Sequence, residues 1–335
     1  MKEYNTIIFG AGAWGTTIAN LIANNLNKET ILWCYESEVA QNINQTHENK
    51  IYLPGIKINK KVIACTDIPV SKANFIFLAN PSQNIYDMLK KIYEKKEFRE
   101  INKKARYIIC SKGIDSKRKK LLSSLVQEFF PKSNISVLSG PTFARELAIK
   151  NPTAVTLANQ NLKTGKEIAN LLKNNYFRIY LNRDIIGVQL CGVLKNILAI
   201  AAGISDGLDL GKNARAAIIA RGIKEIINIV KCFGGKEKTV IGLSGIGDIV
   251  LTCNSKSSRN FKYGYEIAKG LIKIDKTRNS QEVTEGFENI KSIFYFKKKF
   301  NIEAPIIEAV NDIVVGKKRI PSIVKKLLTR PTKEE

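Results

Sequence analysis

Short apolar runs alternate with amphipathic segments along the first half of the chain. The first run, Ile7–Phe9, precedes a glycine-rich turn and a helical pattern over Thr16–Ala23. Helices are also predicted over Asn84–Tyr93 and Lys119–Phe129. This alternation is typical of an α/β fold with a doubly wound parallel sheet. Further apolar runs predict strands at Thr30–Tyr35, Val62–Cys65, Phe75–Leu78, Tyr107–Cys110, Ser136–Leu138, Ala154–Leu157 and Phe177–Leu181.

The pattern changes near Arg183, after which long helical segments predominate. We therefore predict a dinucleotide-binding domain over residues 1–182, an all-helical C-terminal domain over residues 183–330 and a tail over residues 331–335. The segment 185–205 is strongly apolar and contains one charge, Lys195. Three glycines, Gln189 and Asn196 accompany this lysine, which argues against a membrane span and favours a buried core helix.

The glycine-rich turn after the first predicted strand has the pattern of a dinucleotide-binding site. Gly10, Gly12 and Gly15 form G-x-G-x-x-G between a strand and a helix. Gly10 makes the turn, Gly12 lets a pyrophosphate approach the helix start, and Gly15 lets helix and strand pack. Glu36 follows the second strand, 21 residues after Gly15, where a carboxylate binds the adenosine ribose. A merely structural glycine turn is the alternative interpretation.

A second informative segment, residues 242–260, reads GLSGIGDIVLTCNSKSSRN. Three glycines precede Asp248, and a hydroxyl-rich stretch ends in Ser258, Arg259 and Asn260. Glycines let the backbone approach a ligand, and an arginine among hydroxyl and amide groups suits bidentate recognition of a phosphate. Taken alone, the segment is equally compatible with a solvated surface loop.

Lys195 is the best candidate for proton transfer. Burial of an ammonium is costly unless it is paired, and desolvation lowers its pKa, so buried lysines often act as proton donors or acceptors. The chain has one histidine, His47, which lies in a polar run, so the proton must be transferred by another group. Asp248 is a candidate partner that would orient the ammonium. The alternative is a lysine that pairs structurally or extends to water.

The net charge and the cysteine spacing bear on which partners the protein binds and in which cellular compartment it lies. The formal net charge is +24 and the pI is near 9.7, but the lysines are spread along the chain without a nucleic-acid motif. We expect solvated surface lysines whose field draws anionic substrates, and no binding of nucleic acid. The six cysteines show no C-x-x-C spacing, which favours reduced thiols in a cytoplasmic protein without a metal site. Neither export nor membrane insertion is expected.

These segments together resemble the bacterial NAD(P)-dependent glycerol-3-phosphate dehydrogenases. The resemblance runs from about residue 5 to residue 325 and implies a Rossmann domain followed by a helical substrate domain. It implies NAD or NADP as cofactor, and interconversion of dihydroxyacetone phosphate and sn-glycerol 3-phosphate for phospholipid synthesis. The similar segments are Gly10–Thr16, Tyr52–Gly55, Asn80–Gln83, Ser111–Gly113, Ser139–Ala144, Val193–Asn196, Gly242–Asn260, Thr284–Gly286 and Ala304–Ile306.

The resemblance also implies roles for single residues, with Lys195 as the proton acceptor in the oxidation direction. The implied substrate contacts are Lys112, Gly140, Thr142, Lys195, Asp248, Ser258, Arg259 and Asn260. The cofactor contacts from the glycine turn and from the resemblance are Gly10, Gly12, Ala13, Trp14, Gly15, Tyr35, Lys112, Ala144, Arg259, Val283 and Glu285.

Two positions depart from the family pattern. Ala13 stands where a serine is common, and Tyr35 followed by Glu36 stands where an arginine or histidine is common. A carboxylate there repels the 2′-phosphate of NADP, so we expect NADH to serve at least as well as NADPH. Another two-domain dehydrogenase, a basic nucleic-acid-binding protein on a Rossmann scaffold and an inactive NAD-binding regulator remain as alternatives. The sequence is silent on the oligomeric state, and a homodimer is left open.

Overall fold

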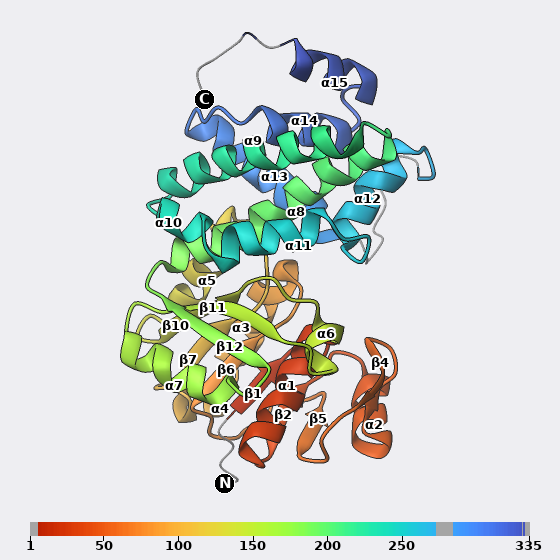
Figure 1. Ribbon diagram of the computed structural model, residues 1–335. Coiled ribbons are helices and arrows are strands. Elements are labelled where there is room, and N and C mark those ends of the chain that lie inside the picture. Colours follow the sequence, from red (N-terminus) through yellow and green to blue (C-terminus); the bar gives the residue numbers. More distant parts are fainter. Residues whose placement is uncertain (1–5, 273–283, 330, 332–335) are drawn as a thin grey trace. The chain divides into compact units, whose positions relative to one another are not determined.

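The computed structural model describes residues 6–272, 284–329 and 331, and the chain forms two compact units, Met1–Gln189 and Leu190–Glu335 (Figure 1). The first unit holds all the described strands, and the described residues of the second unit form helices and their connections. An α/β unit is thus followed by a helical unit, as the change of pattern near Arg183 indicates.

An eight-stranded sheet with the order β12-β11-β10-β7-β6-β1-β2-β5 forms the first unit. The neighbours from β5 to β10 in this order are all parallel, so their carboxyl ends meet at one edge. All of the predicted strands are present. Their bounds are β1 (Thr6–Phe9), β2 (Thr30–Trp33), β5 (Val62–Cys65), β6 (Phe75–Leu78), β7 (Arg106–Ile109), β10 (Asn134–Ser139), β11 (Thr153–Ala158) and β12 (Phe177–Asn182).

Helices cover both faces of this sheet. Ile8 of β1 packs in one apolar cluster with Ile18 and Ile22 of helix α1, whereas its neighbours Ile7 and Phe9 pack in a second cluster on the other face. Alternate residues of a strand point to opposite faces, which explains why an uninterrupted apolar run marks this strand. The helices of this unit are α1 (Ala13–Leu26), α2 (Ser37–Thr46), η1 (Ser82–Asn84), α3 (Ile85–Glu94), α4 (Lys96–Ile101), α5 (Leu122–Phe129), α6 (Ala144–Ala148) and α7 (Leu162–Leu172).

The predicted parallel sheet is confirmed for most strand pairs, and one pair departs from it. Strand β11 runs antiparallel to β10, and β12 is parallel to β11. The connection from β10 to β11 contains only the short helix α6, whose five residues rise ~7.5 Å. A helix that short cannot carry the chain back along a six-residue strand of ~20 Å, so the chain re-enters the sheet in the opposite direction.

One predicted helix begins later than expected. Helix α5 starts at Leu122 rather than at Lys119, because Lys120–Leu121 form strand β9. This strand pairs with β8 (Ile114–Asp115) in a small hairpin, which the sequence pattern did not reveal. A second small sheet pairs β3 (Glu48–Asn49) with β4 (Leu53–Lys57).

Helix α8 (Ile185–Gly207) forms the core of the second unit. It is long and apolar enough to cross a membrane, but 89% of its most apolar window is buried inside the protein. Burial by neighbouring helices is the signature of a core helix, which confirms the prediction for this segment. The other helices are α9 (Gly211–Cys232), α10 (Glu237–Val240), η2 (Leu243–Gly247), α11 (Asp248–Cys253), α12 (Arg259–Ala268), α13 (Thr284–Lys299), α14 (Pro305–Val314) and α15 (Ile320–Leu328).

Glycines bring helices α8 and α12 into backbone contact. A Cβ atom on Gly264 would lie 2.2 Å from the carbonyl oxygen of Ile200, and one on Gly203 would lie 2.0 Å from that of Phe261. Only glycine fits at such a distance. The close contact fixes α12, which begins at Arg259, against the helix that carries Lys195.

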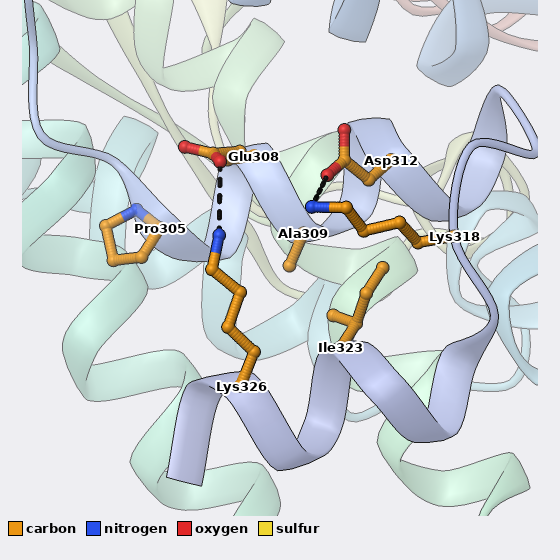
Figure 2. A pocket seen from close by; sticks show the side chains of 7 residues that line it. All are labelled: Pro305, Glu308, Ala309, Asp312, Lys318, Ile323 and Lys326. Atoms are coloured by element: carbon orange, nitrogen blue, oxygen red, sulfur yellow. Dashed lines mark hydrogen bonds and ion pairs between the residues drawn. The ribbon is translucent and has the colours of Figure 1, made fainter. Parts of the chain in front are cut away.

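Helix α15 packs on α14 around a cavity of about 30 Å³ (Figure 2). Ile323 lines the cavity, and two ion pairs close it, between Lys326 and Glu308 at 3.5 Å and between Lys318 and Asp312 at 3.2 Å. A further hydrogen bond from Lys297 lowers the pKa of Glu308. A space of this size holds about one water molecule, so it is a packing feature.

Candidate active site

The glycine turn after β1 is shaped by close backbone packing. Gly10 has a φ of 110°, and a Cβ atom on it would lie 2.7 Å from the backbone carbonyl carbon of Ala79. A Cβ atom on Gly15 would lie 1.8 Å from the carbonyl oxygen of Gly10. Around Gly12, in contrast, no atom of the described residues, its chain neighbours aside, lies within 4 Å of the Cβ position. Two glycines therefore hold the turn against the sheet, and the third leaves its outer face open.

The start of helix α1 fits a pyrophosphate group. No side chain caps this helix, and no acidic residue lies in its first turn, so its first N–H groups are available to an anion. The Thr17 hydroxyl lies 2.8 Å from the carbonyl oxygen of Ala13 and 3.2 Å from that of Ala144. This single hydroxyl brings together two of the expected cofactor contacts. The residues of the turn thus suit the dinucleotide that the sequence predicts.

Glu36 is held by a tyrosine to which the sequence assigned no role. The Tyr52 hydroxyl donates a hydrogen bond to Glu36 Oε1 at 2.7 Å, and this bond raises the pKa of Tyr52 to about 12. The bond occupies one carboxylate oxygen and leaves the other for a sugar hydroxyl. Tyr35, beside it, is 77% exposed, and its ring makes an edge contact with that of Trp33.

Lys112 and Gly140 meet at the carboxyl ends of β7 and β10. The Lys112 ammonium donates a hydrogen bond to the carbonyl oxygen of Gly140 at 3.0 Å. Gly140 lies against β11, where a Cβ atom would be 2.9 Å from the Cα of Val155. The hydroxyls of Ser139 and Thr142 are buried and have no hydrogen-bond partner within the described part of the chain. Buried polar atoms without partners mark places where a ligand can supply one.

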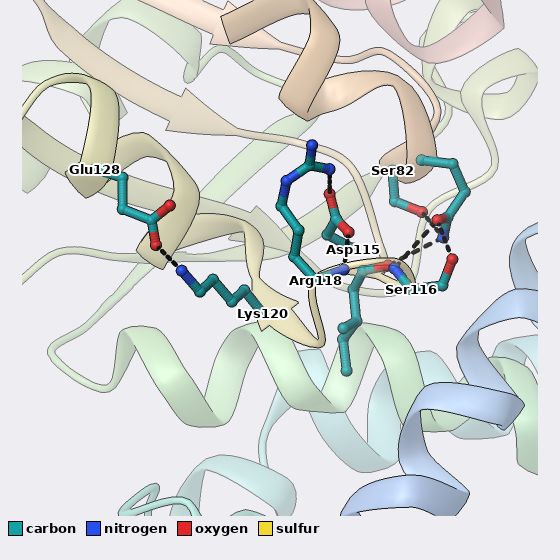
Figure 3. Close-up of polar contacts among 8 residues, drawn as sticks. Ser82, Asp115, Ser116, Arg118, Lys120 and Glu128 are labelled. Carbon is teal, nitrogen blue, oxygen red and sulfur yellow. Dashed lines mark hydrogen bonds and ion pairs between the residues drawn. The ribbon is translucent and has the colours of Figure 1, made fainter. Parts of the chain in front are cut away.

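The chain that follows Lys112 is anchored by a polar network (Figure 3). The Gln83 amide donates to the carbonyl oxygen of Ile114 at 3.0 Å and accepts from the Ser116 hydroxyl at 2.6 Å. Arg118 binds the buried Asp115 at 3.1 Å, within the same hairpin. These bonds fix the β8–β9 hairpin directly after the lysine, so the backbone that carries Lys112 has little freedom.

In the second unit, Lys195 pairs with Asp248. The Lys195 ammonium donates to Asp248 Oδ1 at 2.8 Å and to the Thr252 hydroxyl at 2.9 Å. Thr252 in turn donates to the backbone oxygen of Asp248 at 2.6 Å. Lys195 is 8% exposed and Asp248 is fully buried. The sequence reasoning missed Thr252, although its position four residues after Asp248 places both side chains on one face of helix α11.

The start of helix α12 gathers the remaining substrate candidates. The Ser258 hydroxyl caps the helix by accepting from the N–H of Phe261 at 3.3 Å, and Arg259 follows as an exposed side chain. Asn260 packs against Gly286, where a Cβ atom would lie 2.2 Å from its Oδ1. A guanidinium beside the positive end of a helix suits a phosphate group. Val283 and the side chain of Glu285 lie outside the described residues.

Within residues 6–272 and 284–329, no three or more histidine, cysteine, aspartate or glutamate side chains lie close enough together to hold a metal ion. All six cysteines are free thiols, of which Cys232 is exposed.

The first unit has a mostly parallel sheet with a glycine turn after its first strand, and the second unit is helical and holds a buried lysine–aspartate pair. These features define a two-domain NAD(P)-dependent dehydrogenase. The sequence profile of the N-terminal part of the NAD-dependent glycerol-3-phosphate dehydrogenases matches residues 5–165, and that of their C-terminal part matches residues 184–325. The chain belongs to the NAD-dependent glycerol-3-phosphate dehydrogenase family.

Curated relatives and solved structures agree with this family. The chain is 36% identical over 329 residues to a glycerol-3-phosphate dehydrogenase [NAD(P)+] of Bacillus velezensis, covering 96% of this chain and 93% of the relative. It is 37% identical to the protein of that name from Parvibaculum lavamentivorans, covering 98% and 97%. The crystal structure of glycerol-3-phosphate dehydrogenase from Coxiella burnetii superimposes with a TM-score of 0.90 at 36% identity, covering 98% of this chain and 99% of that one.

Proposed function

We propose that this protein is a cytoplasmic NAD(P)-dependent glycerol-3-phosphate dehydrogenase that reduces dihydroxyacetone phosphate to sn-glycerol 3-phosphate for phospholipid synthesis. The observation that carries the proposal is the buried Lys195–Asp248 pair, at 2.8 Å, in a chain of this family. The reaction consumes one reduced nicotinamide cofactor and one proton for each ketone, and the products are the alcohol and the oxidised cofactor.

Arg259 holds the phosphate group of the substrate in this proposal. Its planar guanidinium can form two parallel hydrogen bonds with phosphate oxygens, and Asn260 and the first N–H groups of α12 add further donors. Lys112, in the first unit, is a further proposed substrate contact, as the resemblance implies. Binding energy from the phosphate, which does not react, then fixes the position of the carbonyl group.

Lys195 supplies the proton. When bound, the nicotinamide cofactor provides the hydride that reduces C2 of the substrate, and negative charge grows on the carbonyl oxygen. The Lys195 ammonium neutralises this charge and protonates the oxygen. Asp248 stabilises the charged lysine at 2.8 Å, and Thr252 directs it by a second hydrogen bond at 2.9 Å. In the oxidation direction, the neutral amine of Lys195 accepts the proton.

Because of Glu36, we expect the enzyme to use NADH at least as well as NADPH. Its carboxylate, held by Tyr52 at 2.7 Å, can accept from a ribose hydroxyl and repels a 2′-phosphate. The measurement is kcat/KM for both cofactors. A tenfold or greater preference for NADPH, about 1.4 kcal/mol, would contradict this part of the proposal.

The first experiment is to mix the purified protein with dihydroxyacetone phosphate and NADH, and to follow the loss of reduced-nicotinamide absorbance. Unphosphorylated dihydroxyacetone and glyceraldehyde 3-phosphate are matched controls for the phosphate and for the position of the carbonyl. We expect rapid oxidation of NADH with dihydroxyacetone phosphate and not with either control compound. Absence of oxidation with either cofactor would refute the proposed substrate.

The partners follow from the same proposal. We expect a small phosphorylated substrate, no insertion into a membrane and no requirement for nucleic acid. The rival assignment as a basic DNA-binding protein requires tight, strongly salt-dependent binding to generic DNA, which a titration at two salt concentrations measures. A homodimer is the oligomeric state to test, by sedimentation of the purified protein.

A further inference from the structure

Asn80 has an unsatisfied side chain next to the glycine turn. It follows β6 and is 7% exposed, and its amide oxygen has no hydrogen-bond partner within the described part of the chain. The backbone around it is engaged, because its carbonyl oxygen accepts from the Ser111 hydroxyl at 2.5 Å and the N–H of Ala79 donates to Phe9 at 2.8 Å. The backbone is thus fixed while the buried side-chain oxygen still needs a donor.

Asn102, in the same unit, is a buried asparagine whose side-chain amide is fully hydrogen-bonded within the protein. It is 2% exposed, its Oδ1 accepts from the N–H of Ala73 at 2.8 Å, and its amide nitrogen donates to the carbonyl oxygens of Ser71 and Phe98 at 3.1 Å. Leaving a buried polar group without a partner is costly, so such groups are rare in folded proteins. The unsatisfied amide oxygen of Asn80 is better explained by a ligand than by the fold.

The strand order indicates which part of a dinucleotide Asn80 faces. The strands β6, β1 and β2 are parallel neighbours, so Asn80, Gly10 and Glu36 follow their carboxyl ends in that order. A Cβ atom on Gly10 would lie 2.7 Å from the backbone nitrogen of Asn80. In such sheets the pyrophosphate sits at the glycine turn and the adenosine ribose at the carboxylate after β2. The other nucleoside therefore extends toward β6, where Asn80 lies, and toward Lys112 after β7.

We propose that Asn80 is a further cofactor-binding residue, whose amide oxygen accepts a hydrogen bond from a hydroxyl of the ribose next to the nicotinamide. This inference rests on the proposed function, and adds to it a residue that distinguishes the two halves of the cofactor. The buried amide oxygen of Asn80 gains a hydrogen-bond donor only when the nicotinamide half is bound. Asn80 therefore strengthens the binding of the complete dinucleotide and not that of its adenosine half.

The test compares two ligands and two asparagine variants. NADH binding is measured by the change in its fluorescence, and ADP, which has the adenosine and the diphosphate but no nicotinamide riboside, is measured by calorimetry. For Asn80→Ala we expect the Kd for NADH to rise roughly threefold to tenfold, the value of one hydrogen bond, while the Kd for ADP stays within about twofold. The melting temperature of Asn80→Ala should equal or exceed that of the wild type, because an unsatisfied buried oxygen is removed.

Asn102→Ala is the matched control, because it removes an asparagine of similar burial whose amide is fully bonded. It should lower the melting temperature and leave both dissociation constants unchanged. An unchanged Kd for NADH in Asn80→Ala, an equal loss for NADH and ADP, or a loss of thermal stability like that of Asn102→Ala would each overturn the inference. If the wild-type protein fails to bind NADH at all, the proposed function fails instead, so the two failures are distinguishable.

Discussion

Replacing Lys195 with methionine, alone and together with a change of Asp248, tests whether its charge serves the stability of the fold, the transfer of a proton, or both. The lysine side chain is 10% exposed, and the carboxylate of Asp248, 2.8 Å away, is 0% exposed. Methionine keeps an unbranched apolar chain of similar length but has no charge, so the main loss is the counter-ion of a buried carboxylate. The Thr252 hydroxyl lies 3.3 Å from the same carboxylate oxygen, but its one hydrogen would have to turn away from the backbone oxygen of Asp248 to bind it.

The expected cost is about 3–5 kcal/mol of the free energy of unfolding, because a buried ion pair that loses one partner leaves an uncompensated charge. For a unit of this size this corresponds to a fall in melting temperature on the order of 10 °C. The double variant Lys195→Met/Asp248→Asn removes the stranded charge and should recover most of the lost stability. Turnover should not recover, because both variants lack the proton donor, and kcat should fall at least about 100-fold in each.

Urea unfolding at neutral pH measures the stability of the wild type, the single variant and the double variant, and steady-state reduction of dihydroxyacetone phosphate measures turnover. NADH binding serves as the control that the first unit is intact in each variant. A single variant as stable as the wild type would show that the carboxylate does not depend on Lys195. Near-normal turnover in either variant would refute proton transfer by this residue.

Further predictions concern the phosphate contact, a helix cap and the thiols. Arg259→Lys should raise the KM for dihydroxyacetone phosphate roughly tenfold to 100-fold while leaving the weak reduction of unphosphorylated dihydroxyacetone unchanged, and an unaltered kcat/KM would count against the assignment. Glu225 is 5% exposed and accepts from the first N–H groups of α14 at 2.7 and 3.1 Å. Glu225→Gln should therefore lower the free energy of unfolding by about 1–2 kcal/mol without changing the activity of the folded enzyme; a urea midpoint equal to that of the wild type would argue against this cap. Burial raises the pKa of the Cys34 thiol to about 12, whereas Cys232 is exposed. Dithiobisnitrobenzoate should thus react quickly with Cys232 and more slowly with the half-buried Cys65 in the native protein, and with the four buried thiols only after unfolding. Several fast thiols would contradict the burial.

The parts of the fold that the sequence predicted well depend on local signals. The strand Phe75–Leu78 is visible as an apolar run because both faces of the sheet are covered, and the glycine turn at Gly10 is visible because its backbone excludes side chains. The helix over 185–205 is visible because nearly every position is apolar. In each case, the pattern that predicts the element lies within a single segment of the sequence.

The missed features depend on contacts between distant segments. The reversal of β11 follows from the length of α6 and from pairing with β10, and no residue of β11 signals it. The hydrogen bond from Tyr52 to Glu36 joins residues 16 positions apart, with α2 and β3 between them in the sequence. Only the folded chain shows that this tyrosine binds the carboxylate which the sequence predicts as the ribose contact.

By itself, the sequence determined the types of the elements and the dinucleotide turn, and it singled out the residue that we propose as the proton donor, because these depend on side-chain chemistry and local backbone freedom. The tertiary structure decided how each group is partnered. It gave Lys195 two partners on α11 and tied Lys112 to Gly140 at 3.0 Å. Among the described residues, it left the side-chain oxygen of Asn80 without a hydrogen-bond partner. The physical reason is that a hydrogen-bond deficit or an ion pair is a property of positions in space, and residues far apart in the chain become neighbours only when the chain folds.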